Sequence, residues 1–368
     1  MNILHIINDL TGGGAQRMLS NVVINEKQNK HIIIVLQGQS HSIKAYDYSK
    51  IQIYFLDIKL HTLFNCFNLI HNLVRKNQIE VIQTWLYMSD LVGGIYKLLN
   101  RGVKLFWNIR HGQVDKKTMS TSSFIAAKVC SKLSFLPNKI ISNSQRAIEN
   151  HIHFGYKKDK FILIYNFVDT ERFVPAYLYT RGLLDVPVKF GYAARFAYEK
   201  GHRVLFDALE LLPSEMKAEF ILVGMGMDKF NRDLSLLMDS KKINHNIKLL
   251  GFCDRMEELV KFYNDIDFHV SSSLTEGFPN AICESLSCAI PNIVTDVGES
   301  AFLAKASGWT VPALDPKELS LAMLAAYNEI SKNHSEYLER RERARLSVTT
   351  RFKIDQILKE YVTTWESD

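Results

Sequence analysis

Two acidic residues lie where an apolar strand ends and a helix begins. Glu276 and Glu284 are eight residues apart in the segment EGFPNAICE, which follows the run DFHVSSS. Gly277 and Pro279 prevent one helix from covering both acids, so Glu276 is expected in a loop. Glu284 is expected in the early turns of a helix that begins near Pro279 or Asn280. The N–H groups of that helix's first turn would face the same place as Glu276, which favours an anionic leaving group there. A favourable interaction with its own helix dipole is the alternative role for Glu284.

Two basic residues, Arg195 and Lys200, occupy a similar position about 80 residues earlier in the chain. They lie in the segment RFAYEKG, directly after an apolar strand and before a helix predicted over 202–212. Because this loop bends, both side chains could reach one pyrophosphate. A pair of surface cations without a specific partner is the alternative interpretation.

A glycine-rich loop, LTGGGAQR at residues 10–17, follows the first strand and opens a helix. Its glycines would let a ligand approach the backbone N–H groups of the helix N-terminus. As a dinucleotide fingerprint it fails, because Gly12 and Gly14 are followed at the third position by Arg17. The second strand also ends in Gln37, where a ribose-binding acid is expected. This disfavours NAD and a dehydrogenase, and leaves a tight turn without a ligand as the alternative.

Asp265 and Asp267 have the D-x-D spacing that can hold a metal ion. They precede a strand, so they are expected at its amino end, away from the edge where strand carboxyl ends meet. Helix capping or solvation is favoured for them. We therefore expect no metal site and no cofactor.

Short β-branched runs alternate with longer segments of helical period along the whole chain, which is typical of βαβ units and parallel sheets. Thirteen strands are predicted, seven before the Pro- and Gly-bearing stretch 175–187 and six after it. We predict an α/β fold of two Rossmann-like, doubly wound domains facing across a cleft. Residues 1–180 would form the first domain and 181–352 the second. Everything after residue 317 is predicted helical, and an amphipathic helix over about 353–368 could pack back on the first domain.

Charge is divided unevenly along the chain. Residues 1–165 carry 21 lysines and arginines against nine acidic residues, a net +12, whereas the remainder carries 24 against 30, a net −6. This asymmetry indicates an anionic partner for the first half, either a membrane surface or a phosphate-bearing substrate. Because no helix-turn-helix, RNP or zinc-finger pattern organises the basic residues, we expect no nucleic-acid partner.

Lysines interleave with apolar residues over 116–139. A basic amphipathic helix there could lie on anionic lipid, or its apolar residues could simply face the core of the first domain. The beginning MNILHIINDL lacks the features of a signal peptide, and no apolar run approaches the roughly 20 residues of a membrane span. The five cysteines form no C-x-x-C pair and fit a reducing compartment. We expect a cytoplasmic protein, with a peripheral location on the inner face of the plasma membrane left open.

In combination these motifs resemble the retaining glycosyltransferases of family 4, which have the GT-B fold. The resemblance spans nearly the whole chain. The segments that carry it are RFAYEKG, EGFPNAICE, GGGAQRML, VGMGMD, YNFVDTERF, QTWLYMSDLVGG and NIRHG.

The resemblance implies a role for each matching residue. Arg195 and Lys200 would bind the donor's diphosphate, Glu276 the hydroxyls of the donor sugar and Glu284 the ribose. His111 would lie near the reacting sugar, so the catalytic set would be Glu276, His111, Lys200 and Arg195, although Arg110 is equally well placed. Further donor contacts would come from Gly277, Phe278, Asn280, Ala281, Gly224, Gly13, Gly14 and Phe252, the last in the segment 251–256 expected against the base. Acceptor-side contacts would come from Arg17, Trp85 and Arg110, with Lys116 and Lys117.

The implied reaction transfers a sugar from a nucleoside-diphosphate donor, a UDP-sugar above all, to a glycan acceptor with retention of configuration. The acceptor could be linked to a polyprenyl diphosphate, and the setting would be bacterial surface polysaccharide assembly such as O-antigen, capsule or lipopolysaccharide. Two alternatives stay open: a nucleotide-sugar epimerase of GT-B fold, and a non-catalytic GT-B subunit that partners an active enzyme. The E-x7-E spacing favours the transferase.

Overall fold

The structure is a computed structural model, and it describes residues 1–10, 13–37, 48–56, 63–176, 187–253 and 255–367. The chain forms two compact units, Met1–Asn166 with Ile354–Asp368, and Phe167–Lys353. The boundary predicted near residue 180 lies outside the described residues. Residues 167–176 belong to the second unit and not to the first, because Ser287 Oγ and the Arg345 guanidinium donate hydrogen bonds to the Phe173 carbonyl, at 2.7 and 3.0 Å.

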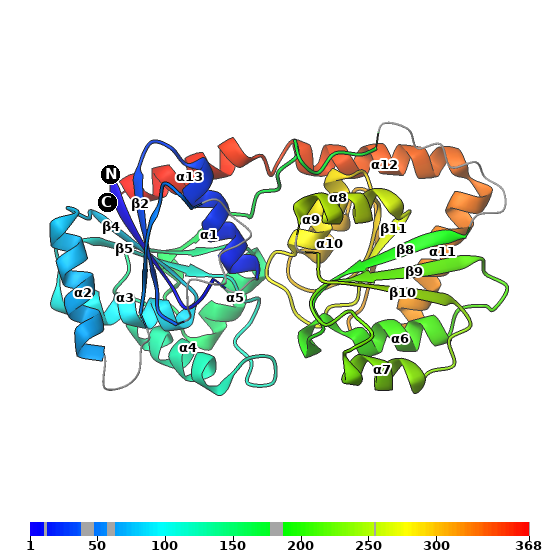
Figure 1. Ribbon diagram of the computed structural model, residues 1–368, viewed down its shortest axis with the longest axis horizontal. Helices are drawn as coiled ribbons and strands as arrows, with labels where there is room; N and C mark the ends of the chain where they lie inside the picture. The colour runs from blue at the N-terminus through cyan, green and yellow to red at the C-terminus, as the bar shows by residue number, and fades with distance from the viewer. Residues whose placement is uncertain (11–12, 38–47, 57–62, 177–186, 254, 368) are drawn as a thin grey trace. The chain divides into compact units, whose positions relative to one another are not determined.

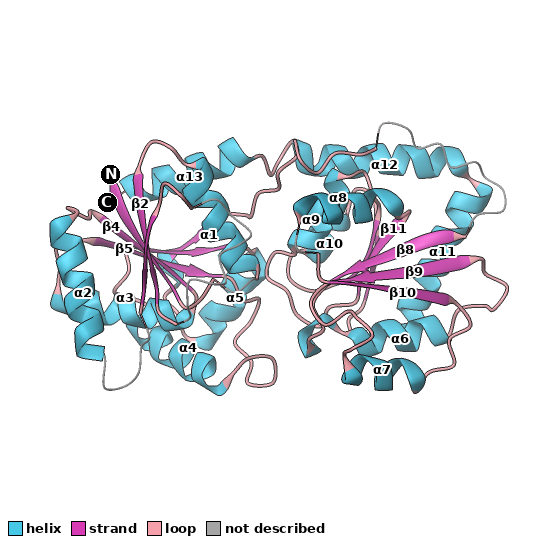
Figure 2. Ribbon diagram, viewed as in Figure 1, coloured by secondary structure: helices cyan, strands magenta, loops and turns pink. Residues whose placement is uncertain are grey.

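The first unit contains a seven-stranded parallel sheet in the order β3-β2-β1-β4-β5-β6-β7, with helices on both faces (Figures 1 and 2). Its strands are β1 (Asn2–Ile7), β2 (Lys30–Val35), β3 (Gln52–Phe55), β4 (Val81–Trp85), β5 (Lys104–Ile109), β6 (Lys139–Ser142) and β7 (Phe161–Leu163). Its helices are α1 (Gly14–Asn25), α2 (Leu63–Lys76), α3 (Tyr87–Leu99), α4 (Thr121–Leu133), α5 (Gln145–Phe154) and α13 (Ile354–Glu366). Helices α2, α3 and α4 share one buried cluster with the sheet.

The second unit contains a six-stranded parallel sheet in the order β10-β9-β8-β11-β12-β13. Its strands are β8 (Val188–Ala193), β9 (Ala218–Val223), β10 (Asn246–Gly251), β11 (Phe268–Ser271), β12 (Asn292–Thr295) and β13 (Trp309–Val311). Its helices are α6 (His202–Glu210), α7 (Arg232–Asp239), α8 (Met256–Asp265), α9 (Asn280–Ser287), α10 (Ser300–Ala304), α11 (Pro316–Lys332) and α12 (His334–Thr349). The thirteen predicted strands correspond in order to β1–β13, so the fold prediction is confirmed.

Both sheets have a point where the strand order reverses. In the first sheet it lies between β1 and β4, and in the second between β8 and β11. The loops that leave the two strands at a switch point diverge to opposite faces, and ligands of doubly wound sheets bind there, outside the strand carboxyl ends. In the second unit these loops carry Arg195, Lys200 and Glu276. Strand pairing in a parallel sheet therefore brings together residues that are far apart in sequence.

Candidate active site

Lys200 and Glu276 meet at the switch point of the second unit. The Lys200 Nζ lies 2.6 Å from Glu276 Oε1, and Ser273 Oγ donates a hydrogen bond of 2.7 Å to the same oxygen. The two side chains are 23% and 12% exposed. Two predicted site residues from different loops thus form an ion pair that is mostly, but not fully, buried.

The loop that carries Lys200 is fixed to the end of β11. Tyr192 Oη donates to the Lys200 carbonyl at 2.5 Å, and Ser272 Oγ donates to the Gly201 carbonyl at 3.0 Å. Gly201 has a φ of +68°, and a Cβ atom there would lie 2.0 Å from the Ser272 carbonyl oxygen. Only glycine can therefore occupy this position without displacing the loop.

Arg195 pairs with Glu199, which the sequence analysis did not single out. An Arg195 guanidinium nitrogen lies 2.5 Å from Glu199 Oε1. Burial alone would raise the pKa of Glu199, but the hydrogen bond and charge of Arg195 bring that pKa below its usual value. Both cations of the site are consequently balanced by carboxylates. The signal available in the sequence was an acid four residues after Arg195 and directly before Lys200.

The Glu276 loop is held from the opposite side by the turn before α10. The Glu299 N–H donates to the Gly277 carbonyl at 3.0 Å, and a Cβ at Gly298 would lie 2.4 Å from the Glu276 carbonyl oxygen. Helix α9 then starts at Asn280 with Pro279 at its N-cap, which confirms the predicted start. No acidic side chain lies in its first turn, so the helix does not neutralise the positive end of its own dipole.

Glu284 is the fifth residue of α9 and only 4% exposed. Its Oε2 accepts a hydrogen bond of 3.0 Å from the Tyr263 hydroxyl of α8. Phe278 is also buried, with its ring 5.3 Å from that of Phe352. Any ribose hydroxyl that bonds Glu284 must therefore reach a carboxylate that is already fixed by a neighbouring helix, whereas Phe278 can offer only its backbone.

The carboxyl ends of β8, β9 and β10 lie next to one another beside these loops. The Gly224 N–H donates to the Gly251 carbonyl at 2.8 Å, and a Cβ at Gly224 would lie 2.1 Å from the Ala194 carbonyl oxygen. The exposed Phe252 ring follows directly. The predicted donor contacts Gly224 and Phe252 thus lie at the same edge of the sheet as Lys200.

The first unit places His111 in the loop after β5, with Arg110 between the strand and the histidine. Its ring is half-buried and stacks on that of Tyr87, with centroids 5.3 Å apart and planes inclined by 15°. Gly13 and Gly14 are exposed at the start of α1, and Arg17 is half-buried in its first turn, whereas Thr11 and Gly12 lie outside the described residues.

Trp85 and Arg110, the predicted acceptor-side contacts, both have partners within the first unit. The Trp85 ring is fully buried, and its Nε1 donates to His5 Nδ1 at 3.2 Å. The Arg110 guanidinium lies 5.2 Å from the centre of that ring and donates to Asn166 Oδ1 and to the Tyr361 hydroxyl of α13. The Trp85 ring also stacks on that of Tyr361, with centroids 6.4 Å apart, so both side chains contact α13.

Asp265 and Asp267 lie at the amino end of β11, as expected. Asp265 Oδ1 is 2.5 Å from Lys189 Nζ, and Asp267 Oδ2 accepts the Lys189 N–H at 2.8 Å. Asp267 is buried, so the solvation expected for it does not hold. Among the described residues no three His, Cys, Asp or Glu side chains are grouped to hold a metal ion.

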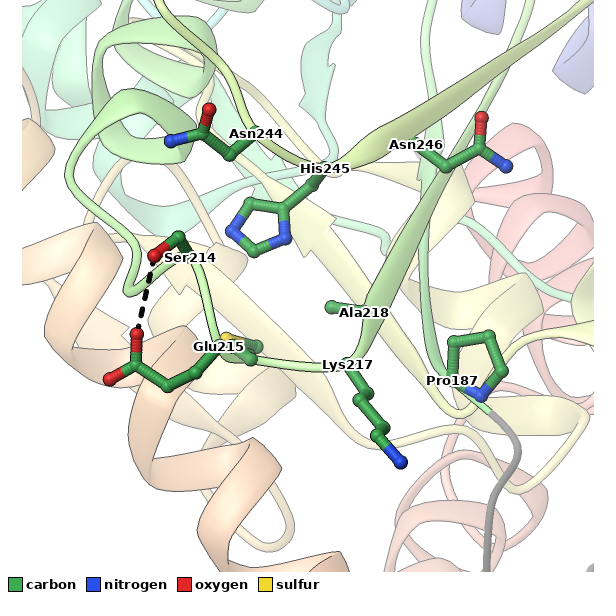
Figure 3. A pocket seen from close by; sticks show the side chains of 9 residues that line it. Pro187, Ser214, Glu215, Lys217, Ala218, Asn244, His245 and Asn246 are labelled. Atoms are coloured by element: carbon green, nitrogen blue, oxygen red, sulfur yellow. Dashed lines mark hydrogen bonds between the residues drawn. The ribbon is translucent and has the colours of Figure 1, made fainter.

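A hollow of about 380 Å³ lies at the opposite, amino edge of the second sheet (Figure 3). It is lined by Pro187, Ser214, Glu215, Met216, Lys217, Ala218, Asn244, His245 and Asn246. These residues precede or begin β8, β9 and β10, whereas Lys200 and Glu276 follow the strands. The hollow is thus separate from the candidate active site. None of the described helices combines the length and apolar character needed to cross a membrane.

Known proteins match both units of the chain. Residues 12–172 match the family model for Glycosyltransferase Family 4, and residues 187–329 match that for Glycosyl transferases group 1. A Campylobacter jejuni relative, N-acetylgalactosamine-N,N'-diacetylbacillosaminyl-diphospho-undecaprenol 4-alpha-N-acetylgalactosaminyltransferase, is 26% identical over 161 residues, or 43% of this chain and 41% of that protein. The Escherichia coli O-antigen biosynthesis glycosyltransferase WclY is 22% identical over 81% of this chain and 80% of its own.

Solved structures of other proteins superpose on this chain over nearly its whole length. Anabaena HepE in complex with UDP-glucose superposes with a TM-score of 0.81 at 18% identity and covers 100% of both chains. The lipopolysaccharide outer core galactosyltransferase WaaB gives a TM-score of 0.70 at 16% identity and covers 99% of both. At such identities the likeness concerns the fold, whereas the two family models concern the sequence. The chain belongs to the glycosyltransferases of family 4 and has their GT-B fold.

Proposed function

We propose that this glycosyltransferase takes its sugar from a UDP-sugar bound at the carboxyl edge of the second sheet. The Lys200–Glu276 ion pair carries the proposal, because it places one cation and one carboxylate side by side where a diphosphate and a sugar hydroxyl would need them. The start of α9, free of acidic side chains, adds positive potential at the same edge. The HepE complexes with UDP and UDP-glucose support this choice of nucleotide.

Donor binding would exchange the partners of this ion pair. The diphosphate offers Lys200 a doubly charged partner and draws it from Glu276, whose carboxylate is then free to accept hydroxyls of the donor sugar. Arg195 would exchange Glu199 for the diphosphate in the same way. Glu284, held by Tyr263, would accept from the ribose. Each of the two cations would thus have an anionic partner both before and after the donor binds.

The reaction breaks the bond between the anomeric carbon and the phosphate oxygen and joins that carbon to the acceptor oxygen. We propose retention by front-face attack, in which the departing phosphate oxygen takes the proton of the acceptor hydroxyl. Lys200, Arg195 and the N-terminus of α9 would stabilise the charge that grows on the leaving group. His111 of the first unit would contact the reacting sugar. This mechanism requires no covalent bond between the donor sugar and a protein side chain.

We propose that the reaction requires no metal ion or other cofactor. Two cations and a helix terminus already provide the positive charge that a diphosphate leaving group demands. The D-x-D aspartates are occupied by Lys189 at the other edge of the sheet. A chelator should accordingly leave the turnover rate unchanged.

A lipid-linked acceptor is proposed from the diphospho-undecaprenol in the name of the Campylobacter jejuni relative. Helix α4 supports a peripheral location on an anionic membrane, because it has no acidic residue and exposes Ile125, Val129, Lys128 and Lys132 along one stripe. Its opposite face packs into the core through Ala126, Ala127 and Cys130. The protein should sediment with phosphatidylglycerol vesicles, and replacement of Lys128 and Lys132 by Glu should abolish this cosedimentation. The matched change at Lys305 and Lys332 of the second unit should have no effect.

Product analysis tests the proposed reaction. Purified protein is incubated with UDP-sugars and a polyprenyl-diphosphate-linked sugar acceptor, and the product is analysed by mass spectrometry and by the anomeric coupling in NMR. We expect a glycosylated lipid with the donor's own anomeric configuration. An epimerised UDP-sugar without transfer would identify an epimerase, inversion would exclude the retaining mechanism, and an inert protein that binds no nucleotide would identify a non-catalytic subunit.

A further inference from the structure

His111 does not lie on a free loop surface but against a ring that is itself fixed. Tyr87 is the first residue of α3, only 1% exposed, and its ring lies nearly parallel to that of His111, with planes 15° apart. Stacked rings at a centroid distance of 5.3 Å are in contact. The stack therefore restricts rotation of the His111 side chain about its own bonds.

The hydroxyl end of Tyr87 is anchored by a buried histidine. His151 Nδ1 lies 2.6 Å from the Ala147 carbonyl, which can only accept, so Nδ1 carries the proton. His151 Nε2 must then accept, and the Tyr87 hydroxyl donates to it at 2.6 Å. Burial lowers the pKa of His151 to about 4, so the ring is neutral near pH 7. The direction of this hydrogen bond is thereby fixed.

The backbone before Tyr87 is strained. Leu86 has a φ of +71°, a conformation that costs a residue with a side chain on the order of 1–3 kcal/mol. Its N–H donates to the Asn108 carbonyl of β5 at 3.1 Å, and Cys130 Sγ approaches the Tyr87 carbonyl at 3.5 Å. Several contacts thus hold an unfavourable turn that starts α3 directly beside the strand leading to His111. Strain of this kind is concentrated at functional sites.

We propose that Tyr87 is a positioning residue that sets the orientation of the His111 ring for catalysis. The inference rests on the proposed catalytic role of His111. Tyr87 touches neither donor nor acceptor in this account, and it acts only through the face of its ring. The aromatic ring is therefore what matters, and the hydroxyl serves to keep that ring in place.

Steady-state kinetics on three variants tests this inference. Tyr87→Phe keeps the stacking face, so kcat should stay within about threefold of the wild-type value. Tyr87→Leu removes the ring, so kcat should fall about 10- to 100-fold, the scale expected for a misplaced catalytic group. The KM for the UDP-sugar should change less than kcat, because Arg195, Lys200, Glu276 and Glu284 all belong to the second unit. His111→Gln shows how far kcat falls when the imidazole itself is removed, and the other two variants are compared with it.

The double variant Tyr87→Leu/His111→Gln separates positioning from a merely structural role. If Tyr87 acts through His111, the kcat of the double variant should lie within about twofold of the kcat of His111→Gln alone. Additive losses, or equal losses in Tyr87→Phe and Tyr87→Leu, would overturn the inference. An unchanged kcat in His111→Gln would remove the catalytic role of His111 and the inference with it, while donor binding would stand.

Histidine-selective NMR provides a check that does not depend on the folding of Tyr87→Leu. The ring signal that disappears in His111→Gln should show an upfield ring-current shift in the wild-type protein and in Tyr87→Phe. A signal at the position of an exposed histidine in either protein would show that the stack does not form, and would overturn the inference.

Discussion

Replacement of Lys200 by Met removes the ammonium group and keeps most of the apolar stem. If Lys200 stabilises the leaving diphosphate, kcat/KM should fall about 10²- to 10³-fold, which corresponds to roughly 3–4 kcal/mol of lost transition-state stabilisation. The ground-state diphosphate loses one charged hydrogen bond, worth about 1.5–3 kcal/mol, so UDP should bind at least about tenfold more weakly. A radiometric transfer assay and calorimetric titration measure the two effects.

The same change should also destabilise the second unit. Glu276 keeps the Ser273 hydroxyl at 2.7 Å but loses its counter-charge, and its side chain is only 12% exposed. Because the pair is not fully buried, we expect a loss of only about 1 kcal/mol and a drop in Tm of about 2–4 °C.

The double variant Lys200→Met/Glu276→Gln separates charge balance from catalysis. It contains no unpaired charge, so its Tm should return toward that of the wild-type protein while its activity stays lost. A double variant that regained activity would refute the reasoning, as would a Lys200→Met enzyme with kcat/KM within about threefold of wild type. Either result would mean that the ion pair is structural.

Further predictions concern stability and metal dependence. Burial raises the pKa of Asp90 to about 8, above the 3.8 of an exposed aspartate, so the folded state retains a proton that the unfolded state releases. The free energy of unfolding should therefore fall between pH 5 and 8 by up to about 1.4 kcal/mol per pH unit, and Asp90→Asn should reduce that slope in urea titrations. Gly201→Ala should abolish UDP binding and lower Tm, because its Cβ would overlap the Ser272 carbonyl; unchanged binding would show that the loop adapts. Tyr361→Phe removes an acceptor from the half-buried Arg110 guanidinium and should cost about 1–3 kcal/mol of stability, measured by urea unfolding, without weakening UDP binding. EDTA should not alter the transfer rate, and inhibition reversed by added Mn²⁺ would contradict the metal-independent mechanism.

The approach of Lys200 to Glu276 could be predicted because each residue follows an apolar strand, and parallel strands end at a common edge. The start of α9 was equally accessible, since Pro at the N-cap and the surrounding residues are local signals. The pairing of Arg195 with Glu199 could not be predicted from such local signals, because it depends on how the loop between β8 and α6 bends.

The surroundings of Trp85 and Arg110 could not be predicted, for a different reason. Trp85 ends β4 and Arg110 directly follows β5, at the edge expected to carry a site, and nothing near them in sequence indicates the contacts that they make. Their surroundings are set by Asn166 and by Tyr361 on α13, which are distant along the chain. A pattern that assigns residues to a strand end cannot show which of them a later helix will cover.

The subdivision of the C-terminal helical region was open to prediction. Asn333 ends α11 and begins α12, and its side chain accepts from the Glu336 N–H at 3.5 Å. The pattern Asn-x-x-Glu is a common helix start. The continuous helical period after residue 317 predicts helix throughout, with an amphipathic last helix over about 353–368, whereas the structure also has a break at Asn333 between α11 and α12.

The central claim is that the carboxyl edge of the second sheet binds a uridine diphosphate. Calorimetric titration of the wild-type protein with UDP, GDP, ADP and NAD tests it directly, with Glu284→Gln as the site variant and Glu215→Gln, in the hollow at the opposite edge, as the matched control. We predict selective binding of UDP that weakens at least about tenfold in Glu284→Gln, the loss of one charged hydrogen bond, and is unchanged in Glu215→Gln. Equal binding in all three proteins, or binding of NAD alone, would contradict the account.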